Sequence, residues 1–189
     1  MIINFVSGNP GKVRELSNIL GKYVKDIELR QLDIDLPEYQ GDPEFIVKEK
    51  LKEAKLRSKD IEGAILVEDT SLFFNAYKGL PGPYIKYFLK AIGTEGLYKM
   101  VSPFEDHSAV AQSIFGLKID DNEPMLFIGR TEGKIVQPRG QNNFGWDPCF
   151  KPNDHYKTYA ELDEDTKNEM SHRSKATKLM INYLNLLEK

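Results

Sequence analysis

The chain has 189 residues, which is enough for one domain with a sizeable hydrophobic core. It carries 26 basic and 29 acidic residues, and a net charge of −3 excludes the basic surplus of a typical duplex-DNA binder. The single cysteine, Cys149, excludes an internal disulfide and a cysteine metal cluster. The opening run is strand-like rather than a basic leader, and apolar runs are too short to span a bilayer. We expect a cytoplasmic protein without a nucleic-acid or membrane partner.

The first third of the chain alternates strand and helix patterns. Strands are predicted over residues 2–6, 26–32 and 64–69, and the last of these ends in two acids. Helices are predicted over residues 11–23 and 44–57. Their expected buried faces are Val13, Leu16, Ile19, Leu20 and Tyr23 in the first, and Val47, Leu51 and Ala54 in the second. This order is typical of an α/β sheet.

The rest of the chain changes the pattern. A strand is expected over residues 71–76, then a helix over 84–92 closed by Gly93, and another helix over 94–101. Two strand-like runs, 108–119 and 125–138, flank a polar turn and predict an antiparallel hairpin. The last helix is expected over 171–187, with Ala176, Leu179, Met180, Tyr183 and Leu187 buried. We therefore predict a mixed sheet with flanking helices.

The turn Ser7-Gly8-Asn9-Pro10-Gly11-Lys12 follows the first strand and opens a helix. Backbone N–H groups at a helix start attract anions, glycine permits close approach, and Lys12 adds a positive charge. The standard phosphate-loop motif is absent, because valine stands at its first glycine (Val6) and at its metal-binding hydroxyl (Val13). A phosphate site and an ordinary turn capped by Asn9 both remain open.

Acidic residues are expected beside this turn. Glu68 and Asp69 close the predicted third strand, and Glu38 lies in the loop after the second. If the first and third strands are parallel, Lys12 and Asp69 face one crevice. Carboxylates beside phosphate repel it unless Mg²⁺ lies between them. Alternatively, Asp69 caps a following turn through Thr70 and Ser71, and Glu38 is simply a loop residue.

Two later segments combine aromatic and basic residues. In Phe144–Phe150, aromatic rings around a glycine could line a slot for a flat ligand, although we favour a plug that packs on the core. In the segment 171–176, Ser171 is a natural N-cap, and His172 and Arg173 follow where the helix dipole disfavours cations. A ligand that accepts hydrogen bonds would explain them, as would plain solvent exposure.

Eight segments occur in the order and spacing of one known family. They are SGNPGK, DLPEYQG, VEDTSLFFNA, GLPGPYIKYFL, GRTEGKIVQPRG, FGWDPCFKP, TYAEL and SHRSKA. The chain thus resembles the inosine triphosphate pyrophosphatases, and the fourth segment looks like the eukaryotic-type branch. The resemblance implies one elongated α/β domain over residues 1–189, with two lobes around a central active-site cleft, in a homodimer. It implies hydrolysis of deaminated 6-oxo purine nucleoside triphosphates (ITP, dITP, XTP) to the monophosphate and pyrophosphate.

The resemblance also implies roles for residues at matching positions. It implies a triphosphate loop of Ser7, Gly8, Asn9 and Lys12, with Lys12 also catalytic. Glu38 and Asp69 match the acids that hold Mg²⁺, for which Mn²⁺ is an alternative, and Asp69 is also the favoured base. Further substrate contacts are implied for Lys50, Thr70 and Lys86. Base and ribose contacts are implied for Phe144, Gly145, Trp146, Asp147, Lys167, His172 and Arg173.

Two other functions compete with this interpretation. A kinase or ATP-driven motor needs a complete phosphate loop, and Val13 replaces the required hydroxyl. A non-catalytic nucleotide or RNA binder gains nothing from carboxylates beside phosphate. Measuring pyrophosphate release separates all three.

Overall fold

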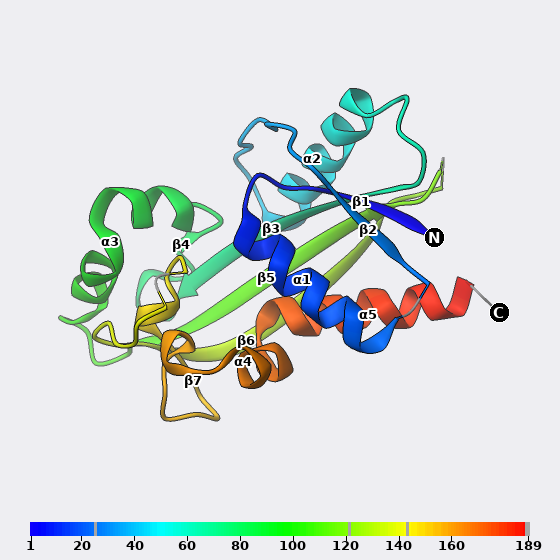
Figure 1. Cartoon of the computed structure of the whole chain (residues 1–189). Coiled ribbons are helices and arrows are strands. Elements are labelled where there is room, and N and C mark those ends of the chain that lie inside the picture. Colours follow the sequence, from blue (N-terminus) through cyan, green and yellow to red (C-terminus); the bar gives the residue numbers. More distant parts are fainter. Residues whose placement is uncertain (25, 121, 143, 188–189) are drawn as a thin grey trace. The chain divides into compact units, whose positions relative to one another are not determined.

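The computed structural model describes residues 1–24, 26–120, 122–142 and 144–187, and within these it contains a seven-stranded mixed sheet and five α-helices (Figure 1). The strands are β1 (Ile2–Val6), β2 (Glu28–Leu32), β3 (Ala64–Phe74), β4 (Pro81–Gly82), β5 (Ser108–Lys118), β6 (Met125–Ile135) and β7 (Phe150–Pro152). The helices are α1 (Pro10–Tyr23), α2 (Pro43–Arg57), α3 (Ile85–Val101), α4 (Glu164–Met170) and α5 (His172–Leu187).

The sheet combines parallel and antiparallel pairs. Its strand order is β2-β1-β3-β5-β6-β7, and β4 pairs with β3 off this path. β1 pairs in parallel with both β2 and β3, whereas β4 runs antiparallel to β3 and β7 antiparallel to β6. The predicted mixed α/β fold is therefore confirmed.

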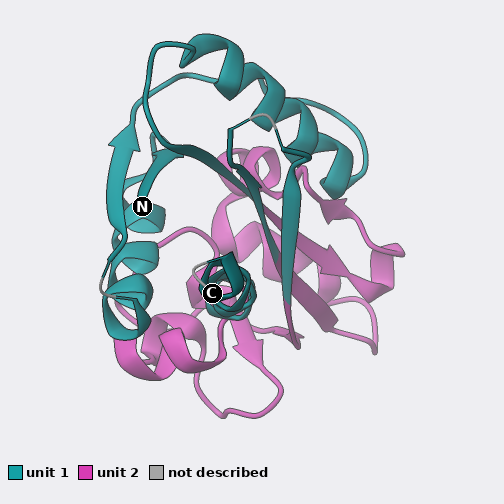
Figure 2. Ribbon diagram, turned by 90° about the vertical axis from the view of Figure 1, so that its right-hand side faces the viewer, with its two compact units in different colours: residues 1–69, 113–129, 173–189 teal, residues 70–112, 130–172 magenta. Residues whose placement is uncertain are grey.

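The chain divides into two compact units (Figure 2). Unit 1 comprises residues 1–69, 113–129 and 173–189, and unit 2 comprises residues 70–112 and 130–172. The boundaries fall inside β3, β5 and β6 and between the neighbours His172 and Arg173. Each unit has a hydrophobic core of its own, and the cleft expected between two lobes stays a prediction.

The core of unit 1 lies on both faces of its part of the sheet, because side chains alternate along each strand. Helices α1 and α5 cover one face, where they pack on residues such as Phe5, Leu66 and Phe115 (Figure 1). Helix α2 covers the other face, where it packs on Val6 and Val67. A strand residue's position in this alternation therefore decides which helices it meets.

The core of unit 2 gathers α3, the ends of the long strands and the segment around Trp146 and Tyr159. Helix α3 is interrupted as predicted: Gly93 has φ +65° and ψ −177°, a conformation that favours glycine, so two helical segments meet there. Helix α4 was not predicted; Asp163 caps it by accepting a hydrogen bond from the Thr166 N–H at 2.8 Å.

One strand prediction was wrong. Residues 64–69 and 71–76 were expected to form two strands, but β3 runs without a break from Ala64 to Phe74. After its parallel pairing with β1 ends near Leu66, the chain stays extended and pairs with β4, Leu72 opposite Gly82. Asp69 therefore caps no turn, because Thr70 and Ser71 belong to the strand.

Two helix faces were also assigned too widely. Tyr23 at the end of α1 is 54% exposed, and in α5 Leu179 and Leu187 are 48% and 49% exposed. The buried stripe of α5 consists instead of Ala176, Met180, Ile181 and Leu184. A pattern of apolar residues does not by itself reveal which of them the neighbouring elements cover. Within the described residues, none of the helices has the length and apolarity needed to cross a membrane.

Candidate active site

The turn between β1 and α1 is closed by Asn9, the N-cap of α1. The Asn9 Oδ1 atom accepts hydrogen bonds from the backbone N–H groups of Gly11 (3.0 Å) and Lys12 (3.2 Å), and Pro10 occupies the first helical turn. The Ser7 hydroxyl accepts a further bond from the Asn9 N–H at 3.2 Å. Gly8 and Asn9 are exposed. The capped turn is thus present, and phosphate binding by its N–H groups would compete with Asn9.

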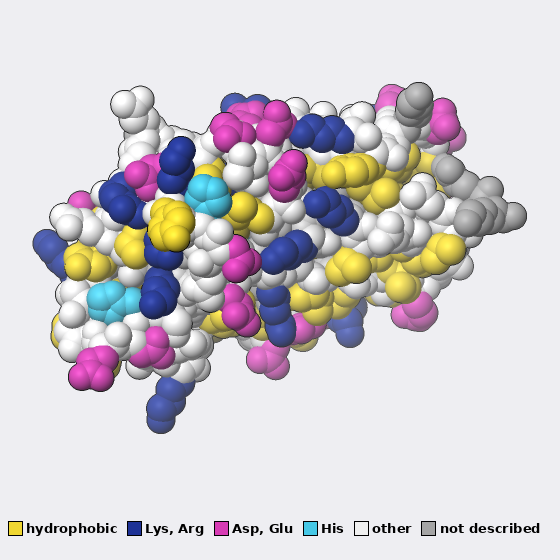
Figure 3. Space-filling view, turned by 90° about the horizontal axis from the view of Figure 1, so that it is seen from below, with side chains coloured by type: hydrophobic (Ala, Val, Ile, Leu, Met, Phe, Trp, Pro, Cys, Tyr) yellow, Lys and Arg dark blue, Asp and Glu magenta, His cyan; other side chains and the backbone are white. Residues whose placement is uncertain are grey.

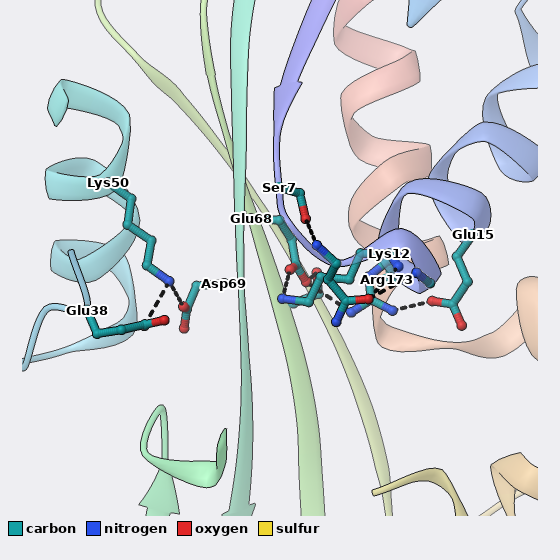
Figure 4. Close-up of polar contacts among 11 residues, drawn as sticks. Ser7, Lys12, Glu15, Glu38, Lys50, Glu68, Asp69 and Arg173 are labelled. Atoms are coloured by element: carbon teal, nitrogen blue, oxygen red, sulfur yellow. Dashed lines mark hydrogen bonds and ion pairs between the residues drawn. The ribbon is translucent and has the colours of Figure 1, made fainter. Parts of the chain in front are cut away.

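Lys12 extends from this turn into a cluster of charged side chains, which we call the Glu68 cluster: Lys12, Glu15, Glu68, Ser113 and Arg173. All five belong to unit 1. Lys12 Nζ forms an ion pair with Glu68 Oε2, and Arg173 bridges Glu68 and Glu15 through its two terminal nitrogens (Figure 4). The Ser113 hydroxyl donates to Glu68 Oε1 at 2.7 Å. The cluster connects α1, β3, β5 and α5.

The charges in this cluster hold each other in the ionised form. Burial opposes ionisation of Glu68, but Lys12 and Arg173 outweigh it, so the pKa of Glu68 lies well below its ordinary value. Burial likewise opposes the charge of Arg173, whereas Glu68 and Glu15 raise its pKa. A buried carboxylate with two cationic partners is stable as an anion.

Asp69 follows Glu68 on β3 but projects to the face that α2 covers. There Lys50 Nζ lies 2.6 Å from Asp69 Oδ1 and 3.5 Å from Glu38 Oε2 (Figure 4). The side chains of Lys50 and Asp69 are 13% and 12% exposed, and that of Glu38 is 39% exposed. The structure therefore brings together the two acids predicted to hold a metal, with a lysine ammonium between them.

Burial dominates the ionisation of Asp69 and raises its pKa, and Lys50 and Lys12 offset only part of that effect. For Lys50, burial is outweighed by the attraction of Asp69 and Glu38, so its pKa is raised and it stays protonated. A carboxylate with a raised pKa beside a fixed cation is suited to accept a proton in catalysis.

The two acids fit the coordination habits of Mg²⁺. The Asp69 Oδ2 atom is buried and has no hydrogen-bond partner among the described residues, which costs free energy unless a cation or another donor contacts it. No group of three His, Cys, Asp or Glu side chains that could hold a metal occurs in the described part of the chain. Mg²⁺ needs only one or two protein carboxylates when phosphates and water complete its shell.

The aromatic segment lies in unit 2, where most of it packs as a plug. Trp146 is 7% exposed and belongs to the hydrophobic core, with its ring 5.3 Å from that of His172 and 6.3 Å from that of Tyr159. His172 also stacks on Tyr159, at 5.9 Å and 18° between ring planes. Phe144 is only half-buried and Gly145 is exposed. Of the predicted base-pocket residues, Phe144 therefore has the accessible ring.

A second buried ion pair closes this part of unit 2. Lys167 Nζ lies 2.5 Å from Asp147 Oδ2, and both side chains are 5% exposed. The same ammonium lies over the rings of Phe144, at 4.9 Å, and Tyr159, at 5.4 Å. Asp147, Lys167 and Phe144 are thus held in one arrangement, and their sharing of a base and ribose pocket stays a prediction.

The remaining predicted residues occupy other places. Thr70 is half-buried on β3, and Lys86 is exposed in the first turn of α3, both in unit 2. Arg173 and His172 are chain neighbours, but Arg173 belongs to the Glu68 cluster in unit 1 and His172 to the aromatic group in unit 2. Contacts of these residues with a base or a phosphate stay predictions.

Sequence reasoning missed part of the Glu68 cluster. Glu15 lies three residues after Lys12 on α1, a spacing that places both on one side of a helix, and Ser113 lies within β5. Glu68 was noticed only as an acid beside Asp69. The strand alternation could have shown that these two neighbours face opposite ways.

Comparisons with known proteins agree on one family. Residues 3–183 match the model of the Ham1 family. A HAM1 protein from Coxiella burnetii is 26% identical, with 98% of each chain covered and a TM-score of 0.83. A Mycobacterium abscessus protein described as a nucleoside-triphosphatase / dITP/XTP pyrophosphatase is 29% identical over 97% of this chain and all of its own, with a TM-score of 0.68.

A third structure is similar in fold. The Ham1 protein of Staphylococcus aureus is 24% identical over the whole of both chains, and its TM-score is 0.80. The match between folds thus extends over the full length of this chain.

Proposed function

The chain belongs to the Ham1 family, and from this membership we propose that it hydrolyses the triphosphates of deaminated, 6-oxo purine nucleosides to the monophosphate and pyrophosphate. ITP, dITP and XTP are the proposed substrates, in a cytoplasmic homodimer. The observation that carries the proposal is the placement of Asp69, a buried carboxylate with one unpartnered oxygen, beside Lys50 and Glu38. A related Mycobacterium abscessus protein described as a dITP/XTP pyrophosphatase supports the choice of substrates.

Charge is the first requirement. A triphosphate carries about four negative charges near neutral pH, so cations must outweigh the acidic surplus of the protein locally. Lys12 supplies one of them, from the turn formed by Ser7, Gly8 and Asn9, and its side chain is 21% exposed. Lys50 and Lys86 are proposed to supply others.

Mg²⁺, or Mn²⁺, is the proposed cofactor, and Glu38 and Asp69 are the residues that would hold it. When bound, the ion supplies Lewis-acid polarisation of phosphate oxygens and neutralises their charge. The acids of this chain otherwise repel the substrate, so the metal explains why carboxylates and a phosphate site coexist.

Asp69 is the proposed base. The Lys50 ammonium donates a hydrogen bond to Asp69 Oδ1 and so orients the carboxylate. Oδ2 has two lone pairs: one would contact the metal, and the other is proposed to accept a proton from the water that attacks the α-phosphorus, after which pyrophosphate leaves. Lys12 is proposed to stabilise the charge on the phosphates during this step.

Base selection is proposed to depend on hydrogen-bond donors. A 6-oxo purine offers acceptors at O6 and N7, and His172 and Arg173 are the proposed donors. Adenine presents a 6-amino donor, and leaving a buried donor unpaired costs about 1–3 kcal/mol. Phe144, Gly145, Trp146, Asp147 and Lys167 are proposed to form the base and ribose pocket, and Thr70 a further contact. Stacking on Phe144 adds affinity for every purine alike.

Pyrophosphate release from ITP, dITP, XTP, ATP and GTP, with and without Mg²⁺, tests the proposal. We expect metal-dependent release from the first three and much slower release from ATP. Equal rates on ATP and ITP would overturn the specificity. Orthophosphate as the first product, or no release from any nucleotide, would overturn the reaction.

A further inference from the structure

The proposed reaction assigns no role to Glu68. We propose that Glu68 is a positioning residue: it holds the Lys12 ammonium in place before a triphosphate arrives. The inference rests on the proposed binding of triphosphate beside the turn between β1 and α1, and it concerns binding rather than bond cleavage.

The two oxygens of the Glu68 carboxylate have different partners. Oε1 accepts a hydrogen bond from the Ser113 hydroxyl at 2.7 Å and one from Arg173 Nη2 at 3.2 Å. Oε2 pairs with Lys12 Nζ (Figure 4). Because a carboxylate is planar, two contacts on Oε1 fix the direction in which Oε2 points. Lys12 therefore meets a carboxylate that β5 and α5 have already oriented.

The Glu68 cluster is buried at Glu68 and Arg173 and partly exposed to solvent at Lys12. The side chain of Glu68 is 0% exposed and that of Arg173 is 3% exposed, whereas that of Lys12 is 21% exposed. Lysine has three N–H donors, so an ammonium that uses one on Glu68 keeps two for phosphate oxygens. Lys12 is therefore accessible to a ligand, while its position is fixed by the buried carboxylate of Glu68.

The other charged residues of the cluster, Glu15 and Arg173, leave Glu68 able to pair with Lys12. Glu15 forms an ion pair with the other terminal nitrogen of Arg173, so Arg173 does not rely on Glu68 alone. Two cations and two carboxylates make the cluster neutral as a whole. Substrate binding by a free lysine costs rotamer entropy, and Glu68 has already removed that freedom in the folded protein.

Inorganic tripolyphosphate is the probe, because it contains the phosphate chain without base or ribose. Its binding to the full chain is measured by calorimetry for wild type, Glu68→Gln, Lys12→Ala and the double variant. The glutamine is nearly isosteric but carries no negative charge, so it holds the Lys12 ammonium less strongly whichever end of the amide faces Lys12. We expect Glu68→Gln to weaken binding about tenfold, the effect of one charged hydrogen bond, and to have no further effect in the Lys12→Ala background.

Glu15→Gln is the matched control, because it removes a carboxylate from the same cluster without touching the partner of Lys12. We expect it to leave tripolyphosphate binding within about twofold of wild type. An equal loss in both backgrounds on Glu68→Gln, or no loss at all, would overturn the proposal. So would a tenfold loss on Glu15→Gln, because the effect would then belong to the whole cluster.

A second variant keeps the test decisive if Glu68→Gln does not fold. Ser113→Ala removes an anchor of Oε1 and keeps all the charges. We expect about threefold weaker binding of tripolyphosphate, again only when Lys12 is present; unchanged binding would overturn the positioning role. A protein that couples Glu68 to Lys12 in these titrations but never releases pyrophosphate would retain this inference and lose the proposed reaction.

Discussion

Glu68 and Asp69 are adjacent on β3, yet their carboxylates lie on opposite faces of the sheet. Glu68 meets Lys12 and Arg173 on the face of α1 and α5, and Asp69 meets Lys50 on the face of α2 (Figure 4). Both lie beyond the point where β1 stops pairing with β3, near Leu66, so they flank the turn that follows β1. The strand β3 therefore carries two neighbouring carboxylates: the buried one of Glu68, and that of Asp69, which is the proposed base.

On the face drawn in Figure 3, charged side chains are mixed rather than segregated by sign. On the face in Figure 3, basic and acidic side chains alternate over short distances and apolar side chains lie between them. Because the net charge of the chain is −3, the cations proposed to bind triphosphate act through local placement and not through a large positive net charge.

Replacing Asp69 by Asn tests the proposed base. The amide keeps the shape of the side chain but accepts a proton poorly, so we expect turnover to fall by about 10²–10⁴-fold, the usual contribution of a general base. Steady-state pyrophosphate release from ITP measures the loss, and circular dichroism checks the fold. Near-normal turnover of Asp69→Asn would show that Asp69 is not the base.

Replacing Lys50 by Met tests the metal site through metal binding itself. The ammonium lies between Glu38 and Asp69, so we expect it to compete with a divalent ion, and Lys50→Met to bind Mn²⁺ about tenfold more tightly in the absence of nucleotide. The affinity is obtained from a titration in which the electron paramagnetic resonance signal of free Mn²⁺ is measured. Lys48→Met, an exposed neighbour on α2, is the control and should match wild type. Unchanged or weaker binding in Lys50→Met would contradict the placement of the site.

Replacing Glu68 by Gln tests stability and its pH dependence. The variant leaves Lys12 without its charged partner and Arg173 with Glu15 alone, so we expect a loss of about 3–5 kcal/mol in the free energy of unfolding at pH 7. The pKa of Glu68 is lower in the folded than in the unfolded protein, so its stabilisation is complete well above the ordinary value of 4.5. It is lost as pH falls below that value.

Urea unfolding of wild type and Glu68→Gln between pH 7 and pH 3 measures this difference. We expect the two stabilities to converge as the pH falls, because only wild type loses the contribution. A gap that stays constant with pH would mean that the carboxylate charge is not responsible.

Phe144 and Trp146 should respond differently to replacement by Ala. Trp146 is in the core of unit 2, so we expect its loss to cost about 3–5 kcal/mol of stability. Phe144 is half-buried, and its loss should weaken ITP binding by about 1–3 kcal/mol, the value of one stacked base, with a smaller effect on stability. Thermal unfolding and ITP titration of both variants separate the roles. A Phe144→Ala protein that binds ITP normally would exclude its ring from the pocket.

The sequence by itself determined the local features. The helix start at Asn9-Pro10, the break at Gly93 and the strand–helix order follow from capping, backbone conformation and periodicity, which act over a few residues. The motifs from SGNPGK to SHRSKA identified the family for the same reason: each is a short segment with fixed chemistry. These local features can be predicted without knowing which elements lie next to them in the fold.

Only the tertiary structure decided which charges meet. Arg173 contacts Glu15 and Glu68 across 158 and 105 positions of sequence, and no local pattern encodes such pairs. The continuous strand β3 was likewise decided by its partners, since β4 extends the ladder where a turn was expected. Burial in a low-dielectric interior then makes those distant pairs strong. The alternation of side chains along β3 places Glu68 beside Lys12 and Asp69 beside Lys50.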